Sequence, residues 1–500
     1  MKVTNDSQET LSARLFAEKL ALKLDAELDV ALYRQLSEQL RQAIIALKLM
    51  PGELLPSTRD LAVALNVSRK TVFRCYEDLQ SQGYLKTEAG LGTFVSSAGF
   101  AAPKASGEKI SAHKLTQYAQ SLLDWPDELS HQGDHPELHF GAPPVSELPL
   151  AAWRQVMLKQ LRNTEITQFY YDTEAFGYPP LRQALASYLL RSRALHCDPE
   201  QLIVFSHALS PLRLFAKMVV EQGDAVAIEN PGFPFARQVF ASQGAKIIPI
   251  NVDAQGLCVQ ELKTLKEPIK LVYVTPSHQD PCGVMMSLER RKELLSWAKS
   301  NNCIVLEDDY DCEFRYTGSS LPALMALDEN ESVVYLGDMW KTLFPLVNVG
   351  YLVLPKRLTE VFRKAQSLSW AKASTSLPFF DQLALTEFMN EGLFERHLRK
   401  TRANYASRYR NLILGLSTYF AERVEYAKES GSMQLLIKFK QPLDDQHVKT
   451  TANAAGLAVI STEDYYYDDF VENEYLLAFV MLDEAEMSRR LKHWAALLYV

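Results

Sequence analysis

The sequence predicts two domains of different fold class: a small domain of three helices and a β-hairpin, and a large α/β domain with a mostly parallel sheet. Two observations predict this division. Residues 29–95 hold three short helical patterns followed by two short β-rich stretches, whereas the chain from about residue 137 alternates β-rich runs with helical patterns. The length of 500 residues also exceeds the usual size of one domain.

Composition and targeting signals limit the classes of protein that this chain can represent. Hydrophobic residues make up 47% and charged residues 23%, which is typical of a globular protein and excludes disorder as the main state. The first twenty residues lack the apolar core of a signal peptide, and no apolar run reaches the ~18 residues that span a bilayer. We therefore expect a cytoplasmic protein that does not enter a membrane.

The six cysteines are scattered along the chain. They form no C-x-x-C pair and no Cys/His cluster at the spacing of a zinc site. Free thiols are the usual state of such cysteines in a reducing compartment. We therefore expect free thiols and no bound metal.

The net charge conceals a difference between the two domains. The chain has 53 Lys and Arg against 61 Asp and Glu, and the resulting net charge of −8 by itself argues against nucleic-acid binding. Residues 29–98 carry eight positive and seven negative side chains, a net charge of +1, so the remainder carries −9. The acidity belongs to the large domain, and the small domain remains a candidate for binding DNA.

Local signals in the small domain predict where its helices begin and end. Ser57 and Ser68 are good N-caps, Pro51 cannot continue a helix, and Gly83 is a good C-terminal stop. The helices are expected over residues 29–48, 58–65 and 69–82, and the hairpin strands over 84–87 and 92–95. The buried stripes are expected to be Leu32, Leu36, Leu40, Ala43, Ile44 and Leu47 in the first helix, and Val72, Cys75, Tyr76 and Leu79 in the third.

Three helices followed by a hairpin form a winged helix-turn-helix. The third helix places five donors in its first two turns, Ser68, Arg69, Lys70, Thr71 and Arg74. With the helix N-terminus, these groups suit phosphates and base edges in the major groove. Pattern alone leaves a second interpretation open, an ordinary helical domain with a solvated basic face.

Three segments of the small domain resemble the DNA-binding domain of GntR-type bacterial regulators: LYRQLSEQLRQAI, PGELLPSTRDLAVALNVSRKTVFRCYEDLQSQGYL and GLGTFV. The resemblance implies a double-stranded DNA operator as the partner. It places the following residues at the DNA surface: Ser57, Arg59, Ser68, Arg69, Lys70, Thr71, Gly90 and Thr93.

The large domain shows the β-α-β rhythm of a parallel sheet covered by helices. Strands are expected over residues 202–205, 225–229, 246–250, 271–275, 303–307 and 333–337, and helices over residues 181–193, 211–221, 237–243 and 288–301. Ligands of such sheets bind beyond the carboxyl ends of the strands.

Three strand candidates end in side chains that together suit an aldehyde cofactor. A lysine such as Lys341 would supply a Schiff base, an Asp from an adjacent strand end would keep a pyridine nitrogen protonated, and a Tyr hydroxyl would donate to a phenolic oxygen. Taken singly, a strand-end Asp or Lys is more often a cap or a surface charge.

Five further segments resemble the fold-type-I aminotransferase domain of MocR/GabR-type regulators: FGYPPLRQALASYLLRSRALHCDPEQLIV, ENPGFPFAR, VTPSHQDPCGVMMSLERRKELLSWA, VLEDDYDCEFRY and YLGDMWKTLFPLVNVGYLVLP. The resemblance implies the PLP-dependent-transferase fold and the cofactor pyridoxal 5′-phosphate (PLP). Carried over by motif, Lys341 is the Schiff-base lysine, Asp308 pairs with the pyridine nitrogen and Tyr310 faces the phenolic oxygen. Phe233 stands where the family has a ring-stacking Tyr, and Asn348 where it has an Arg that pairs with phosphate.

The departures from this family concentrate on groups that would bind anions. Besides Asn348, they are His207 and Leu209 in the phosphate-binding stretch, Trp340 in place of a Ser, Asp280 beside the phenolic oxygen, and Leu476 in place of an Arg for the substrate carboxylate. A lost charge-assisted contact weakens phosphate binding by roughly 1.5–3 kcal/mol. His207 could restore a phosphate contact if protonated, but a neutral histidine facing the core is the simpler interpretation.

The resemblances together predict a chain of four parts: an N-terminal extension over 1–28, the DNA-binding domain over 29–98, a linker over 99–136 and an aminotransferase-like effector and dimerisation domain over 137–500. We expect a homodimeric transcriptional regulator that senses a small effector, an amino acid or a cofactor-like molecule, through PLP on Lys341. Its transaminase activity is expected to be weak or limited to a half-reaction.

Two other interpretations stay open at this point. One is a working aminotransferase with a DNA-binding appendage. The other is a regulator that has lost PLP and uses the same cleft for another ligand or only for dimerisation.

Overall fold

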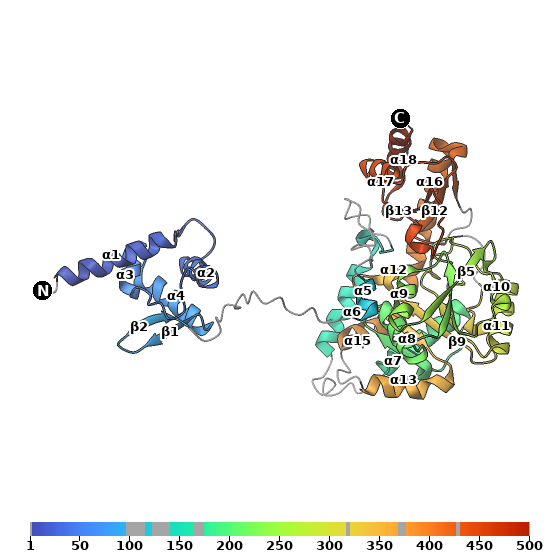
Figure 1. The fold of residues 1–500 in the computed structure, drawn as a ribbon, viewed down its shortest axis with the longest axis horizontal. Coiled ribbons are helices and arrows are strands. Elements are labelled where there is room, and N and C mark those ends of the chain that lie inside the picture. Colours follow the sequence, from blue (N-terminus) through green and yellow to red (C-terminus); the bar gives the residue numbers. More distant parts are fainter. Residues whose placement is uncertain are drawn as a thin grey trace. The chain divides into compact units, whose positions relative to one another are not determined.

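The computed structural model describes residues 3–96, 116–122, 141–163, 175–316, 321–368, 377–426 and 431–499. The chain folds into two separate units, Met1–Lys114 and Leu115–Val500 (Figure 1). Most of the predicted linker lies outside the described residues. Within it, the structure describes a short helix, α5 (Gln117–Ser121).

The N-terminal unit is a winged helix-turn-helix, which confirms the predicted fold of the small domain (Figure 1). Ser57 Oγ accepts the Asp60 N–H at 3.2 Å, and Ser68 Oγ accepts the Thr71 N–H at 3.1 Å, so both predicted N-caps form. The elements are α1 (Val3–Lys19), α2 (Leu32–Ile45), α3 (Thr58–Ala64), α4 (Arg69–Ser81), β1 (Leu85–Glu88) and β2 (Gly92–Val95).

One apolar core holds these helices together. The stripe predicted for α4 is buried throughout, and the Tyr76 hydroxyl donates to the Pro56 carbonyl at 2.9 Å. The stripe predicted for α2 was too long: Leu47 is 42% exposed and lies beyond the end of the helix, with φ of +56°. Helix α1, which lies in the predicted N-terminal extension, packs against α3.

An eight-stranded sheet forms the centre of the large unit, in the order β3-β10-β9-β8-β7-β4-β5-β6. The pairs β9-β8, β8-β7, β7-β4 and β4-β5 are parallel, while β10 and β6 run antiparallel to their neighbours. This confirms the mostly parallel sheet. The strands are β3 (Leu202–Phe205), β4 (Ala225–Asn230), β5 (Lys246–Asp253), β6 (Gly256–Leu257), β7 (Ile269–Val274), β8 (Ile304–Asp308), β9 (Val333–Asp338) and β10 (Gly350–Val353).

Helices cover both faces of this sheet (Figure 1). Alternate strand residues therefore enter different cores: Leu271 and Tyr273 pack with one set of helices, and Val272 and Val274 with another. The helices of this part are α6 (Leu150–Asn163), α7 (Pro179–Arg193), α8 (Leu209–Val219), α9 (Pro234–Ser242), α10 (Val259–Thr264), α11 (Leu288–Ser300), α12 (Trp340–Leu343), α13 (Lys356–Leu368) and α15 (Phe379–Asn390).

A second, smaller sheet lies toward the C-terminus, and the sequence did not predict it. Its four antiparallel strands have the order β11-β12-β14-β13 and pack with α16, α17 and α18 around a separate apolar core. The elements are α16 (Leu393–Tyr419), β11 (Val424–Tyr426), β12 (Gln434–Phe439), α17 (Asp445–Ala454), β13 (Val459–Ser461), β14 (Glu474–Ala478) and α18 (Glu484–Leu498).

Among the residues that the structure describes, no helix is both long enough and apolar enough to cross a bilayer. The same residues include no group of three or more Cys, His, Asp or Glu that could hold a metal ion. All six cysteines belong to the described residues and are free thiols.

Candidate functional site

Lys341 is buried at the carboxyl end of β9, in the first turn of α12, with 7% of its surface exposed. Its Nζ donates to Asp311 Oδ2 at 2.9 Å and lies 4.5 Å from the centroid of the Tyr310 ring. A buried amine needs such partners, because an isolated charge is costly to remove from water. The structure thus brings the predicted lysine and tyrosine into contact, and adds Asp311 as an ion-pair partner.

Asp308, the predicted partner of a pyridine nitrogen, is the last residue of β8 and is buried. The Tyr273 hydroxyl on the neighbouring strand β7 donates to its Oδ2 at 2.5 Å. Burial raises the pKa of Asp308 to about 7, although the hydrogen bond from Tyr273 acts in the opposite direction. The carboxyl group is therefore held in place but is close to half protonated near neutral pH.

Asp280 lies in the loop after β7 and is buried beside the same lysine. Burial raises its pKa to about 7, and the charge of Asp311 raises it further, while Lys341 and a hydrogen bond from Tyr310 lower it. Tyr310 thus faces Asp280 in this structure. Its predicted role toward a phenolic oxygen stays a prediction.

Carboxyl groups outnumber cations around Lys341. Asp338, at the end of β9, accepts the Trp340 N–H at 2.7 Å, and burial raises its pKa to about 7. The charges of Asp280, Asp311 and Asp338 all interact with Lys341. The environment of the lysine therefore carries an excess of potential negative charge.

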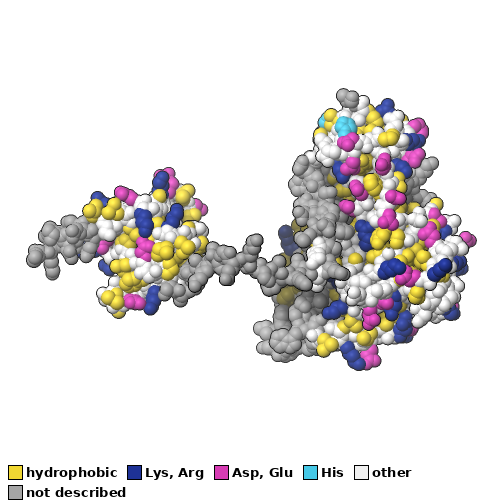
Figure 2. Space-filling model, viewed as in Figure 1, with side chains coloured by type: hydrophobic (Ala, Val, Ile, Leu, Met, Phe, Trp, Pro, Cys, Tyr) yellow, Lys and Arg dark blue, Asp and Glu magenta, His cyan; other side chains and the backbone are white. Residues whose placement is uncertain are grey.

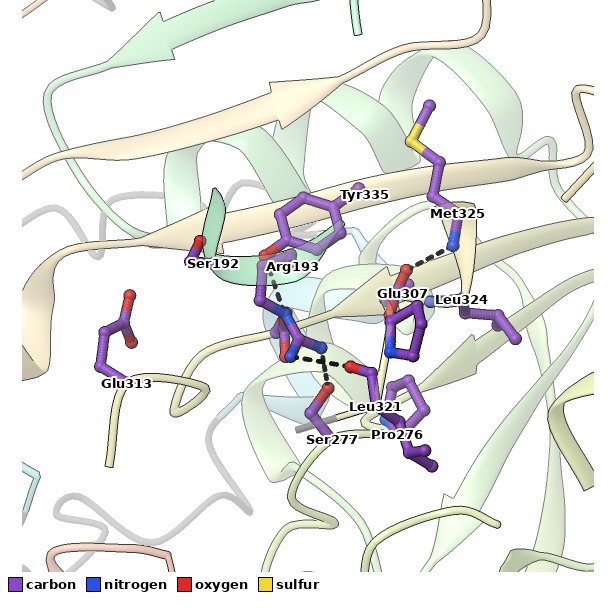
Figure 3. Close-up of polar contacts among 12 residues, drawn as sticks. Ser192, Arg193, Pro276, Ser277, Glu307, Glu313, Leu321, Leu324, Met325 and Tyr335 are labelled. Carbon is purple, nitrogen blue, oxygen red and sulfur yellow. Dashed lines mark hydrogen bonds and ion pairs between the residues drawn. The ribbon is translucent and has the colours of Figure 1, made fainter. Parts of the chain in front are cut away.

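Arg193 forms a buried ion pair next to this site that sequence reasoning missed (Figure 3). Its Nε donates to Asp309 Oδ2 at 2.6 Å, and its two Nη atoms donate to Ser277 Oγ at 2.5 Å and the Leu321 carbonyl at 3.2 Å. The Tyr335 hydroxyl also donates to Asp309, at 2.7 Å. Burial alone would raise the pKa of Asp309, but Arg193 and these hydrogen bonds bring it below its ordinary value.

The residue on the other side of Asp308 is fixed as well. Glu307 accepts the N–H groups of Leu324 at 2.7 Å and Met325 at 2.8 Å (Figure 3). Both neighbours of Asp308 are therefore anchored to other loops.

The sequence carried no local signal for the role of Arg193. Its ion-pair partner Asp309 lies 116 residues further along the chain, so the pair could not be predicted from neighbouring residues.

The positions that depart from the aminotransferase pattern do not supply cations. His207 is exposed rather than facing the core as we expected, and its Nδ1 accepts the Leu209 N–H at 3.1 Å. Partial burial and the charge of Arg213 lower the pKa of His207, so the ring is neutral near pH 7. Asn348 precedes β10, and its buried Oδ1 has no hydrogen-bond partner among the described residues.

Two further predicted positions have apolar surroundings. Leu476 is fully buried on β14 and packs with Ile460 and Tyr465. These residues form a small apolar cluster of their own, so Leu476 offers no charge to a substrate carboxylate. Phe233 is half-buried before α9, 5.5 Å from Phe235 between ring centroids, and its stacking on a cofactor ring stays a prediction.

The predicted DNA-binding residues lie on α3, α4 and the hairpin of the N-terminal unit. Arg59, Arg69, Lys70 and Arg74 are exposed, and Figure 2 shows Lys and Arg side chains beside hydrophobic ones on one face of this unit. Arg69 Nε donates to Thr58 Oγ1 at 3.4 Å, which connects α4 to α3.

Several of the polar residues in this set also serve the fold. Ser57 and Ser68 cap helices, and Thr71 bonds Ser68 through its hydroxyl at 2.8 Å. Thr93 lies 3.2 Å from Thr87 across the hairpin, between hydroxyl oxygens, and Gly90 turns the hairpin with φ of +79°. Their contacts with DNA stay predictions.

Comparison with known proteins agrees with both parts of the fold. The model of the bacterial regulatory proteins of the gntR family matches residues 32–95, and that of the class I and II aminotransferases matches residues 138–477. The probable rhizopine catabolism regulatory protein MocR of Rhizobium meliloti is 32% identical over 474 residues, which cover 93% of each chain. The HTH-type pyridoxine biosynthesis transcriptional regulator PdxR of Corynebacterium glutamicum is 27% identical and covers 93% of this chain and 95% of that one.

Solved structures resemble the large unit. The kynurenine aminotransferase of Pyrococcus horikoshii superposes with a TM-score of 0.66 at 26% identity, covering 77% of this chain and 95% of that chain. Fold and site thus define a class in which a gntR-type DNA-binding domain is joined to an aminotransferase domain. The chain belongs to the family of HTH-type transcriptional regulators that includes MocR.

The aminotransferase family binds PLP, so the residues can be tested for their fit to this group. Lys341, Asp308 and Tyr310 suit its aldehyde and ring. The other half does not fit, because a phosphate carries about −1.5 to −2 charges and needs donors or cations. Asn348 and a neutral His207 supply no charge, and the Leu209 N–H is already bonded to His207.

The raised pKa of Asp280 predicts how stability depends on pH. Between pH ~4 and 7 the unfolded chain loses this proton while the folded chain keeps it, so stability falls as pH rises. We expect Asp280→Asn to raise the free energy of unfolding at pH 8, by on the order of a few kcal/mol, and to change it little at pH 4.5. Tryptophan fluorescence in urea measures this, since all six tryptophans lie beyond residue 120.

Asp309→Asn is the matched control, because the pKa of this carboxyl is lowered and its charge pairs with Arg193. It should destabilise the large unit at pH 8 by roughly 3–5 kcal/mol. An equal effect of Asp280→Asn at both pH values would contradict the raised pKa of Asp280.

Proposed function

We propose that this chain is a DNA-binding transcriptional regulator whose aminotransferase-like domain senses a small ligand through Lys341. The proposal assigns DNA binding to residues 29–98, connection to residues 99–136, and ligand binding and homodimer formation to residues 137–500. The observation that carries it is the pairing of a basic recognition helix, α4, with a buried lysine in a domain where the buried Leu476 takes the place of the arginine that would bind a substrate carboxylate.

A sensor has different needs from an enzyme, and the site agrees better with the former. An aminotransferase must hold a substrate carboxylate in a defined orientation through repeated turnovers. Leu476 occupies the position of the expected arginine and is fully buried in a core. Lys341 nevertheless keeps a nucleophilic amine, which can capture a carbonyl compound without any turnover.

PLP is the family's cofactor and the first ligand to test at Lys341. In this proposal the lysine meets the aldehyde, Asp308 the pyridine nitrogen, Tyr310 the phenolic oxygen and Phe233 the ring. Asn348 lies toward the phosphate, where the family has an arginine. In this proposal PLP takes the orientation that it has in the family, and the altered phosphate-binding positions make its affinity weak.

The proposed DNA contacts can be tested with the full-length protein. Duplexes selected from a random pool provide the probe, and fluorescence anisotropy at stated salt concentrations measures affinity. We expect Arg69→Ala to weaken binding about 10-fold or more, because it removes a phosphate or base contact. Arg41→Ala is the control: this arginine on α2 is paired with Glu38 and should change affinity less than about 2-fold.

Failure of the wild-type protein to enrich any sequence would refute the regulator proposal. Equal losses in the two variants would show that α4 does not carry the contact.

The role of Lys341 is tested by absorbance during titration with PLP, followed by borohydride reduction and peptide mass analysis. We expect a saturable absorbance change and a mass addition on Lys341, both absent from Lys341→Ala. A working aminotransferase would also convert an amino acid and a 2-oxo acid continuously. Steady turnover that Lys341→Ala abolishes would therefore favour that alternative over a sensor.

A further inference from the structure

Three chain segments meet at one corner of the large sheet, next to Lys341. Gly350 at the start of β10 pairs with Phe205 at the end of β3 and with Asp338 at the end of β9. A Cβ on Gly350 would lie 2.8 Å from the His207 carbonyl oxygen, so the chain after β3 passes directly over this glycine. The Met339 N–H donates to the Val349 carbonyl at 2.9 Å. His207, Asn348 and Trp340 therefore surround the same corner.

Three backbone hydrogen-bond donors of this corner are bonded within the protein. The Leu209 N–H donates to His207 Nδ1 and the Ser210 N–H to the His207 carbonyl, both at 3.1 Å. The Trp340 N–H donates to Asp338 at 2.7 Å. These are the backbone donors that a bound anion would otherwise use at a helix N-terminus.

Asn348 and Trp340 bring no charge to this corner. The buried Oδ1 of Asn348 lacks a hydrogen-bond partner among the described residues, and its amide NH2 can donate a hydrogen bond to a phosphate but cannot offset the phosphate's charge. Trp340 stacks on Phe344 with ring centroids 3.7 Å apart. Arg213 is exposed one turn into α8 and is the cation whose charge lowers the pKa of His207.

Charge around Lys341 also opposes an anion. The lysine is paired with Asp311, and Asp280 and Asp338 lie close enough to interact with it. A phosphate would add about −1.5 to −2 charges to this group. In a buried site, with little screening by water, the phosphate would repel whichever of these carboxyl groups are ionised.

Building on the proposed function, we infer that the ligand captured by Lys341 is a neutral or cationic aromatic aldehyde that carries no phosphate. Its aldehyde carbon would react with the lysine amine, and an aromatic ring with a basic nitrogen would meet Asp308. The Lys341 ammonium first transfers a proton to Asp311. The free amine then adds to the carbonyl carbon, the carbonyl oxygen leaves as water, and a carbon–nitrogen double bond remains.

The test compares two probes that differ only at the phosphate end. One is PLP, and the other is 5′-deoxypyridoxal, in which a methyl group replaces the phosphate-bearing arm. We expect the wild-type full-length protein to bind 5′-deoxypyridoxal at least 10-fold more tightly than PLP, measured by absorbance titration. Lys341→Ala should bind neither.

A gain-of-function variant makes the test independent of folding defects. Asn348→Arg should tighten PLP binding at least 10-fold and leave 5′-deoxypyridoxal binding within 3-fold of wild type. Asn348→Leu removes the amide without adding charge and should tighten neither, which makes it the matched control. Together these results would support the inference.

Two outcomes would overturn it, and they differ in what else they refute. Tighter binding of PLP than of 5′-deoxypyridoxal by the wild type overturns the inference alone, and loss of that preference in Arg213→Ala would identify the cation responsible. Failure of both aldehydes to react overturns the inference together with the proposed role of Lys341.

Phe73 carries a second, independent inference about the N-terminal unit. It lies on α4 but outside the buried stripe, and half of its side chain is exposed. It follows Arg69 by four residues and Lys70 by three, so the three side chains are neighbours on the helix surface. An exposed aromatic ring among cations suits a partner that offers both phosphates and apolar groups.

We propose that Phe73 reads a thymine in the major groove of the operator by contact with its 5-methyl group. Apolar side chains on recognition helices distinguish thymine in this way, because none of the other three unmodified bases presents a methyl group in that groove. Arg69 and Lys70 would hold the helix against the backbone at this position.

Replacing thymine by deoxyuridine, one position at a time, removes only the methyl group from a selected duplex. We expect one such replacement to weaken wild-type binding about 5-fold and to leave Phe73→Ala binding unchanged, as measured by anisotropy. Phe73→Leu keeps an apolar side chain and should retain part of the discrimination. Specific binding in which every replacement affects wild type and Phe73→Ala equally would overturn this inference while leaving the DNA-binding proposal intact.

Discussion

The site in the large domain depends on the buried ion pair between Arg193 and Asp309. Asp309 stands between Asp308 and Tyr310, so its position determines theirs. The guanidinium also bonds Ser277 and the Leu321 carbonyl, which connects the end of α7 to the segments that follow β7 and β8. A buried pair costs much desolvation and is favourable only when its remaining donors and acceptors are satisfied. Arg193 donates to Asp309, Ser277 and the Leu321 carbonyl, and the same bonds fix the strand ends on which Lys341 relies.

Unlike Asp309, whose ionised form is stabilised by Arg193, the carboxyl groups around Lys341 are destabilised when they ionise. Each of Asp280, Asp308 and Asp338 has its pKa raised by burial, which means that its ionised form is disfavoured in the fold. Natural proteins place such unfavourable arrangements at functional sites and compensate for them elsewhere. Here the compensation includes the apolar cores on both faces of the sheet and the Arg193 network. A ligand that brings a positive charge or a hydrogen-bond donor recovers part of this cost when it binds.

Sequence patterns predicted the parts of the fold that depend on local signals. Ser57 and Ser68 cap the helices as expected, and continuous apolar runs such as Leu271–Val274 predict strands buried on both faces. The second sheet was missed because β12, whose burial alternates along Gln434–Phe439, pairs with a strand about forty residues away. Its pattern has meaning only once that partner is known.

The candidate site shows the same limit. Motif resemblance directed attention to Lys341, Asp308 and Tyr310, and the structure places Lys341 against Tyr310. Motifs could not reveal Asp311 as the partner of the lysine, because a contact across thirty residues of sequence depends on how β8 and β9 pair.

The exposure of Phe73, in contrast, can be inferred from the local sequence pattern. This residue is apolar yet falls outside the period of the buried stripe on α4, and such a residue has no structural need to be apolar.

The retained lysine and the altered anion-binding positions agree with each other once sensing and catalysis are distinguished. A ligand shifts a protein between two states only by the difference in its affinity for them. A covalent bond to Lys341 supplies affinity without a phosphate or carboxylate anchor, so the residues at 348 and 476 are free to change. Catalysis has no such freedom, because each turnover requires the substrate to be oriented and then released. In a regulator, the amine and the buried groups that hold it are the parts of an aminotransferase site that sensing still needs, and Asp311, Asp309 and Arg193 keep that amine in place.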